Sequence, residues 1–210
     1  MKSNIEYSLY LVTDREVLVG TDIYTGVEEA IKGGVTVVQI REKSLGTLEF
    51  YNIAVKIKKI TDKYKIPLIV NDRIDIAQAI GAAGVHLGQS DMPADIARSI
   101  IGENKIIGVS TASLKEAQKA EKQGADYVGV GAMFPTTTKD DARAVSVQCL
   151  KEIKENISIP VVAIGGINEK NVALLKSANI DGIAVVSDIL SKKSIKSAAE
   201  KLSAMMRCLD

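Results

Sequence analysis

The sequence predicts a closed (β/α)8 barrel, in which eight parallel strands are each followed by a helix. Short β-branched runs alternate regularly with segments of helical periodicity. The strand candidates are nearly continuous apolar runs, which is typical of parallel strands covered on both faces. Eight such units fit a chain of 210 residues, at the small end of the range for this barrel. An open doubly wound sheet is the alternative, but no long insertion or extra layer interrupts the count.

The elements follow one another in a steady order. The strand candidates are residues 7–12, 35–41, 67–71, 84–87, 105–109, 127–131, 160–164 and 182–186. The helical segments are residues 23–32, 47–64, 74–82, 94–101, 114–123, 147–156, 169–177 and 195–206. Gly33-Gly34, Gly81, Gly102 and Gly124 lie just past apolar-periodic segments, where a left-handed helix cap is expected. Without a linker or low-complexity run, residues 1–210 are expected to form one domain.

The composition argues against several classes of function. A net charge of +1 and the absence of Trp give no footprint for nucleic acid. No apolar run is long enough to span a bilayer, and the first residues hold no apolar signal core. Cys149 and Cys208 lack metal or redox spacing, so we expect free thiols in the cytoplasm and no disulfide. A homo-oligomer is compatible with the sequence.

Polar side chains end the second strand candidate. Residues 35–43 read Val-Thr-Val-Val-Gln-Ile-Arg-Glu-Lys, so Gln39, Arg41 and Lys43 share one face of an extended chain. Two cations this close repel each other and lose hydration when they are partly enclosed. A phosphate or diphosphate is the natural counter-charge. The alternative is a solvated strand end without a ligand.

Two carboxylates follow the next two strand candidates, Asp72 after the third and Asp91 after the fourth. Adjacent strands place their following loops side by side, so these side chains can approach each other. Two carboxylates facing a diphosphate suggest Mg2+ bridging protein and phosphate oxygens. Each Asp also precedes a predicted helix, so N-capping is the alternative. His86, the only histidine, lies inside a strand, and a satisfied structural role is favoured over a general base or metal ligand.

Hydroxyl groups follow the fifth and sixth strand candidates. Ser110 can bond a phosphate or cap the next helix, and the sequence leaves both open. The longest irregular stretch comes after residues 127–131 and holds Thr136, Thr137, Thr138 and Lys139. These groups suit a loop that wraps a phosphate, and the length suits a lid that excludes water. A mobile polar loop is the alternative.

The last two strand candidates predict a phosphate site. In (β/α)8 barrels the loops after strands 7 and 8 frequently bind phosphate through backbone N–H groups. Gly165-Gly166 lets the backbone approach an anion closely, and Ser187 adds a hydroxyl. With the cationic, metal-assisted cluster on strands 2 to 5, one barrel mouth would hold two anion sites. Two phosphorylated small molecules joined in one pocket would explain both.

Assembled in order, these motifs resemble the thiamine-phosphate synthase family over nearly the whole chain. The segments that carry the resemblance are residues 39–43 (QIREK), 71–73 (NDR), 84–93 (GVHLGQSDMP), 108–110 (GVS), 127–131 (YVGVG), 134–139 (FPTTTK) and 163–166 (AIGG). Each is weak alone, and all seven in sequence order are specific. The resemblance implies that a hydroxymethylpyrimidine diphosphate loses pyrophosphate while a thiazole phosphate captures its methylene group. When the thiazole arrives carboxylated, carbon dioxide is lost as well.

The resemblance also implies roles for individual residues. The pyrimidine diphosphate would be held by Gln39, Ile40, Arg41, Glu42, Lys43, Asn71, Ser110 and Lys139. Within this set, the catalytic side chains would be Arg41, Lys43, Ser110 and Lys139. Asp72 and Asp91 would bind Mg2+. The thiazole phosphate would be held by Thr136, Thr137, Thr138, Gly166, Val186 and Ser187.

An electron-rich aminopyrimidine can support a benzyl-like cation, so a dissociative path needs no protein nucleophile.

Three alternatives are weighed against this function. A thiazole tautomerase on the same barrel needs a histidine after the fifth strand, where this chain has Ser110 and Thr111 leading to Ala112. A non-catalytic phosphometabolite-binding barrel is not excluded by one sequence, but no expected charged residue is missing. A Schiff-base aldolase needs a lysine inside a strand core, and none is found.

Overall fold

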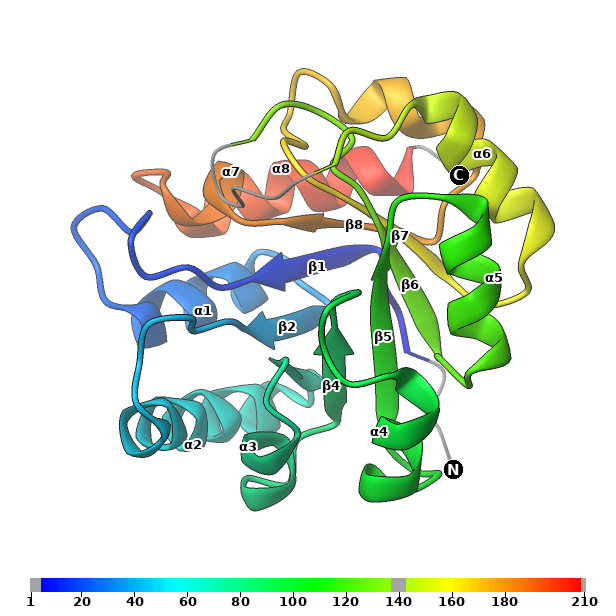
Figure 1. The fold of residues 1–210 in the computed structure, drawn as a ribbon. Helices are drawn as coiled ribbons and strands as arrows, with labels where there is room; N and C mark the ends of the chain where they lie inside the picture. Colours follow the sequence, from blue (N-terminus) through cyan, green and yellow to red (C-terminus); the bar gives the residue numbers. More distant parts are fainter. Residues whose placement is uncertain (1–4, 137–142, 209–210) are drawn as a thin grey trace.

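The computed structural model describes residues 5–136 and 143–208, and its strands close into a parallel barrel (Figure 1). The strands are β1 (Leu9–Val12), β2 (Val37–Ile40), β3 (Leu68–Asn71), β4 (Gly84–Leu87), β5 (Ile106–Thr111), β6 (Tyr127–Val130), β7 (Val161–Ile164) and β8 (Gly182–Val185). Each pairs in parallel with the next along the chain, and β8 pairs with β1. The predicted (β/α)8 barrel is therefore confirmed, and the open doubly wound sheet is excluded.

Helices surround the barrel (Figure 1). They are α1 (Ile23–Lys32), α2 (Thr47–Tyr64), α3 (Ile74–Ala79), α4 (Ala94–Ile101), α5 (Leu114–Lys122), α6 (Val147–Asn156), the 3-10 helix η1 (Val172–Ala178), α7 (Ser187–Leu190) and α8 (Ile195–Arg207). Four of the predicted helices, α1, α2, α4 and α6, have the bounds expected from the sequence. Among the described residues, no helix is both long and apolar enough to cross a membrane.

Three helical expectations need correction, the first of which is the end of α3, expected at residue 82 and found at Ala79. Residues 169–177 were expected to form an α-helix, but the chain forms a tight turn there and then η1. The Asn171 side chain accepts from the backbone N–H of Asn168 at 2.8 Å, so it stabilises that turn and does not cap a helix. The sequence pattern indicates no helix between β8 and α8, but the structure has the short helix α7 there, which begins at Ser187, directly after its N-cap Val186.

The core has two layers. The larger layer fills the space between the strands and the outer helices. The second is made of side chains that point into the barrel from alternate positions along the strands. Its members are Tyr7, Tyr10, Val12, Val37, Ile69, Ile106, Tyr127, Val162 and Ala184. Because both faces of each strand are covered, the strands are nearly continuous in apolar residues.

Candidate active site

The two candidate metal ligands lie at the ends of neighbouring strands. Asp72 follows β3 with a φ of 60°, a left-handed conformation that is uncommon outside glycine. Its N–H donates to the carbonyl oxygen of His86 at 2.9 Å, which ties the end of β3 to β4. Neither Asp caps a helix, because the N-cap positions of α3 and α4 are Arg73 and Pro93. Asp91 instead accepts from the N–H of Gly88 at 2.7 Å. The capping alternative is therefore wrong.

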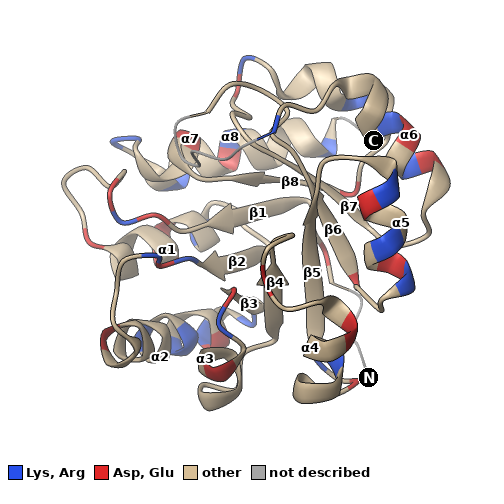
Figure 2. Cartoon of the chain, viewed as in Figure 1, with Lys and Arg blue, Asp and Glu red and all other residues tan. Residues whose placement is uncertain are grey.

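The pKa of Asp72 shows what surrounds this carboxyl. This pKa is raised to about 6, first by burial and then by the hydrogen bond and the negative charge of Asp91, whereas Lys43 and Arg41 act in the opposite direction. The ends of β2, β3 and β4 therefore bring two cations and two carboxylates into one electrostatic neighbourhood. Figure 2 shows acidic and basic segments together where β2 and β3 end.

This donor set fits a hard divalent cation. Two carboxylates forced together at a partly buried position are stabilised by a positive charge between them. Mg2+ is usually held by one or two carboxylates, with waters and substrate phosphates as the other ligands. Among the described residues, no cluster of three or more Asp, Glu, His or Cys side chains could hold a metal alone. A cation here would therefore need further oxygen ligands from its phosphorylated substrate or from water.

Other members of the β2 motif face different surroundings. The Ile40 side chain is fully buried among the core residues, so only its backbone could meet a substrate. The ion pair of Glu42 is not indicated by the sequence: its nearly buried carboxylate lies 3.0 Å from Arg15 Nε. Burial raises the pKa of Glu42, and Arg15 opposes this shift. Asn71 is the last residue of β3 and is half-buried.

A chain of polar side chains crosses the barrel interior. Gln39 Nε2 donates to Tyr10 Oη at 2.8 Å, and Tyr10 Oη lies 2.8 Å from Tyr127 Oη. Tyr127 Oη lies 2.9 Å from His86 Nδ1, and His86 Nε2 lies 2.9 Å from Ser110 Oγ. Both ring nitrogens of His86 therefore have partners, as expected for a satisfied histidine. The helix-capping alternative for Ser110 is wrong, because a serine three residues later caps α5.

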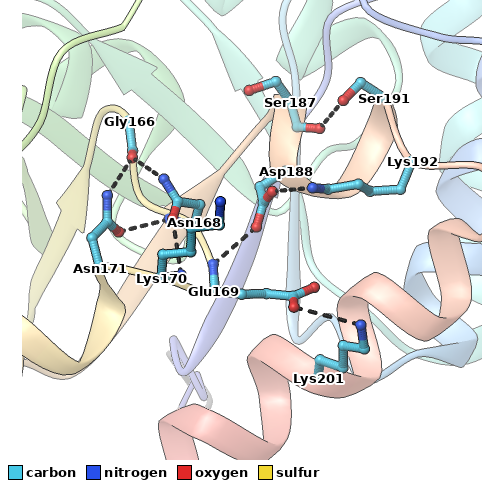
Figure 3. A network of polar contacts seen from close by, with 10 residues as sticks. All are labelled: Gly166, Asn168, Glu169, Lys170, Asn171, Ser187, Asp188, Ser191, Lys192 and Lys201. Carbon is cyan, nitrogen blue, oxygen red and sulfur yellow. Dashed lines mark hydrogen bonds and ion pairs between the residues drawn. The ribbon is translucent and has the colours of Figure 1, made fainter.

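The glycine-rich loop after β7 is held by asparagine side chains (Figure 3). Gly165 and Gly166 have φ values of 98° and 64°, a left-handed backbone conformation that favours glycine. The carbonyl oxygen of Gly166 accepts from Asn168 Nδ2 at 3.1 Å and from Asn171 Nδ2 at 2.9 Å. These bonds fix the peptide plane after Gly166. Sequence reasoning missed both asparagines, although a Gly-Gly-Ile-Asn run after a strand is a signal for a side-chain-stabilised turn.

The same loop is tied to the start of α7. Asp188 Oδ2 accepts from the N–H of Glu169 at 3.1 Å, and Asp188 Oδ1 pairs with Lys192 at 2.6 Å (Figure 3). Val186 is the N-cap residue of α7, and Ser187 is its first residue, with an exposed side chain. Asp188 is therefore paired internally, and so is the carboxylate of Glu169, which lies 3.5 Å from Lys201 Nζ.

The loop after β6 is only partly described. Thr136 is half-buried, and the loop packs against the glycines, because a Cβ on Gly166 would lie 2.5 Å from the carbonyl oxygen of Pro135. The predicted site residues Thr137, Thr138 and Lys139 lie outside the described residues.

Fold and rim together define a (β/α)8 barrel of the class that acts on phosphorylated small molecules at the carboxyl ends of its strands. The family model described as thiamine monophosphate synthase matches residues 9–189. The chain belongs to this family, which confirms the resemblance expected from its seven motifs.

Individual relatives agree with this assignment. A protein of Clostridium acetobutylicum named thiamine-phosphate synthase is 60% identical over 93% of each chain. One of the same name from Clostridium tetani is 58% identical and covers 95% of this chain and 96% of its own. The solved structure of thiamine phosphate pyrophosphorylase from Pyrococcus furiosus is 40% identical, covers 98% of both chains and superposes with a TM-score of 0.91.

Proposed function

We propose that this protein is a thiamine-phosphate synthase, a transferase that joins a pyrimidinylmethyl group to a thiazole phosphate. The substrates are 4-amino-2-methyl-5-hydroxymethylpyrimidine diphosphate and the thiazole phosphate or its carboxylated form. The products are thiamine phosphate and pyrophosphate, with carbon dioxide when the thiazole is carboxylated. Relatives more than half identical over nearly the full chain support the activity. The observation that carries the site assignment is the Asp72–Asp91 pair beside Arg41 and Lys43.

The pyrimidine diphosphate is assigned to the rim of β2 to β5. Arg41 and Lys43 face the charge that develops as pyrophosphate leaves, with Ser110 and Lys139 as further catalytic donors. Gln39 and Asn71 hold the pyrimidine end, and Ile40 and Glu42 contribute through the backbone of the same segment. Asp72 and Asp91 would hold Mg2+, which when bound supplies positive charge against the diphosphate oxygens.

The thiazole phosphate is assigned to the other side of the same rim, after β6 to β8. Gly166 and Ser187 offer a backbone N–H group and a hydroxyl beside α7, and Val186 lies between β8 and that helix. Thr136, Thr137 and Thr138 add hydroxyls from the loop after β6. Neutral donors suit a phosphate that stays bound through the reaction, whereas cations suit the diphosphate that departs.

The chemistry requires no covalent intermediate with the protein. The aminopyrimidine stabilises the methylene cation, and the barrel's task is to orient the two fragments and to stabilise the leaving group. Electron-withdrawing substituents on the pyrimidine should therefore slow turnover strongly. Rates that barely change with such substituents would count against the dissociative path.

The activity test uses the full chain with both phosphorylated substrates and Mg2+, with pyrophosphate release as the readout. We expect pyrophosphate and thiamine phosphate in equal amounts, and neither product when one substrate is omitted. A proton-exchange assay on the carboxythiazole separates a tautomerase from a synthase. Exchange without pyrophosphate would favour the tautomerase, and binding without either reaction would favour a non-catalytic barrel. A cytoplasmic location completes the proposal, and a homo-oligomer is compatible with it.

A further inference from the structure

The polar chain inside the barrel joins five different strands. Gln39 lies on β2, Tyr10 on β1, Tyr127 on β6, His86 on β4 and Ser110 on β5. Tyr10 and Tyr127 are each 1% exposed, and His86 is 8% exposed. Four consecutive contacts of 2.8, 2.8, 2.9 and 2.9 Å connect the two ends. Both end residues are assigned to the pyrimidine diphosphate site.

The direction of this chain follows from counting protons. The Gln39 side chain meets Tyr10 with its NH2 group, which donates. Within the described part of the chain, the other hydrogen-bond partner of Tyr10 Oη is Tyr127, so Tyr10 donates its own proton to Tyr127. Tyr127 then donates to His86 Nδ1, which leaves the imidazole proton on Nε2. His86 Nε2 donates to Ser110 Oγ. The opposite direction would leave the buried Tyr10 proton without an acceptor, which costs the full desolvation of that group.

We propose that Tyr10, Tyr127 and His86 are positioning residues that fix the Gln39 amide and turn the Ser110 hydroxyl into a donor toward the pyrimidine diphosphate. This inference rests on the proposed function for its substrate. Because Ser110 Oγ accepts from His86, its own proton is directed away from the barrel interior. The rim then presents an oriented O–H group to the diphosphate.

Two features show that the barrel is built around this chain. Gly108 and Gly129 lie on β5 and β6, the strands that also carry Ser110 and Tyr127. A Cβ on Gly108 would lie 2.1 Å from Tyr127 Cζ, and one on Gly129 would lie 3.1 Å from His86 Cε1. Burial also raises the pKa of both Tyr10 and Tyr127, so each phenol keeps its proton and remains a donor.

The kinetic test replaces only the hydroxyl groups. Tyr127→Phe and Tyr10→Phe each interrupt the series of hydrogen bonds and keep the aromatic ring. If one variant folds poorly, the other is still informative. We expect kcat/KM for the pyrimidine diphosphate to fall about tenfold in each, because one buried hydrogen-bond partner is lost. The KM for the thiazole phosphate should not change. Tyr7→Phe is the matched control, since its ring lies 4.8 Å from that of Tyr127 but its hydroxyl is not part of the chain.

A second measurement does not depend on the proposed reaction. His86 is the only histidine, so 15N-labelled histidine reports a single imidazole. We expect the Nε2–H tautomer in the wild type and in Tyr7→Phe, and a mixture or the Nδ1–H form in Tyr127→Phe. The inference would be overturned if His86 of the wild type carried its proton on Nδ1, or if Tyr10→Phe and Tyr127→Phe were as active as Tyr7→Phe. If the wild type releases no pyrophosphate, the proposed function fails, and the tautomer alone decides whether the chain has this direction.

Discussion

Replacing Asp72 by Asn should stabilise the metal-free protein while weakening its affinity for Mg2+. Asp72 is a half-buried carboxyl next to Asp91, so its negative charge is unfavourable unless a cation is present. Asn removes the charge and tolerates the left-handed φ of 60° at this position. The variant therefore isolates electrostatics from backbone strain.

The magnitude follows from the difference in pKa between folded and unfolded states. Asp72 titrates near 3.8 in the unfolded chain and near 6 in the folded protein. Between these values the folded state binds more protons, so the free energy of unfolding falls as pH rises and stays low above about pH 7. At about 1.36 kcal/mol per unit, the upper limit is about 3 kcal/mol. Partial solvent exposure of the carboxyl reduces this, and we expect about 1 kcal/mol.

The assay is thermal unfolding in chelator at about pH 8 and about pH 4. For a chain of this size, Asp72→Asn should unfold about 2–4 °C higher than the wild type at the higher pH and equally at the lower pH. Saturating Mg2+ should raise the wild-type midpoint more than that of the variant, because only the wild type keeps both carboxylates. A variant no more stable at pH 8, or equally stabilised by Mg2+, would refute the reasoning.

Three further predictions concern the two sides of the rim. Arg41→Ala should lower turnover about 100-fold with little change in thermal unfolding, and near-wild-type turnover would disprove its leaving-group role. Ser187→Ala should chiefly raise the apparent constant for the thiazole phosphate, and an effect confined to the pyrimidine partner would contradict that assignment. Gly166→Ala should destabilise by about 1–3 kcal/mol, because its φ is 64° and its Cβ would lie 2.5 Å from the carbonyl oxygen of Pro135. The control is Gly46→Ala, whose Cβ would have no atom within 4 Å, and the free energy of unfolding of both variants is compared with that of the wild type.

The order of elements could be predicted because it depends on local patterns. Apolar runs, helical periodicity and glycines that follow a helical segment can all be read from the local sequence. Gly81 and Gly102, for example, have the positive φ expected of such glycines. The sequence pattern places the end of α3 three residues too late, because apolar residues continue past Ala79 through the turn to Ala82. The turn before η1 was missed because its stability comes from the Asn171 side chain, which competes with helical hydrogen bonding.

The clustering of charges at the rim could also be expected, because parallel strands bring their following loops together. The choice between capping and metal binding for Asp72 and Asp91 could not be made from the sequence. Both roles place an Asp shortly before a helix, and only the observed N-caps, Arg73 and Pro93, separate them. The pairing of Glu42 with Arg15 could not be predicted from the sequence either, because it joins the loops that follow two different strands.

The glycines inside strands gain a physical meaning from the interior polar chain. Gly in a strand is usually read as a weak point, because it adds entropy to the unfolded state and packs no side chain. In a small barrel, however, the interior has a fixed volume, and a large side chain on one strand requires a small one on its neighbour. Gly108 satisfies this requirement, because it pairs with His86 of β4 on one side and with Tyr127 of β6 on the other. Gly129 of β6 also leaves room for the His86 ring, which reaches it from β4 across the barrel interior. A strand glycine next to a strand bearing Tyr or His is therefore a sequence signal for a polar group inside such a barrel.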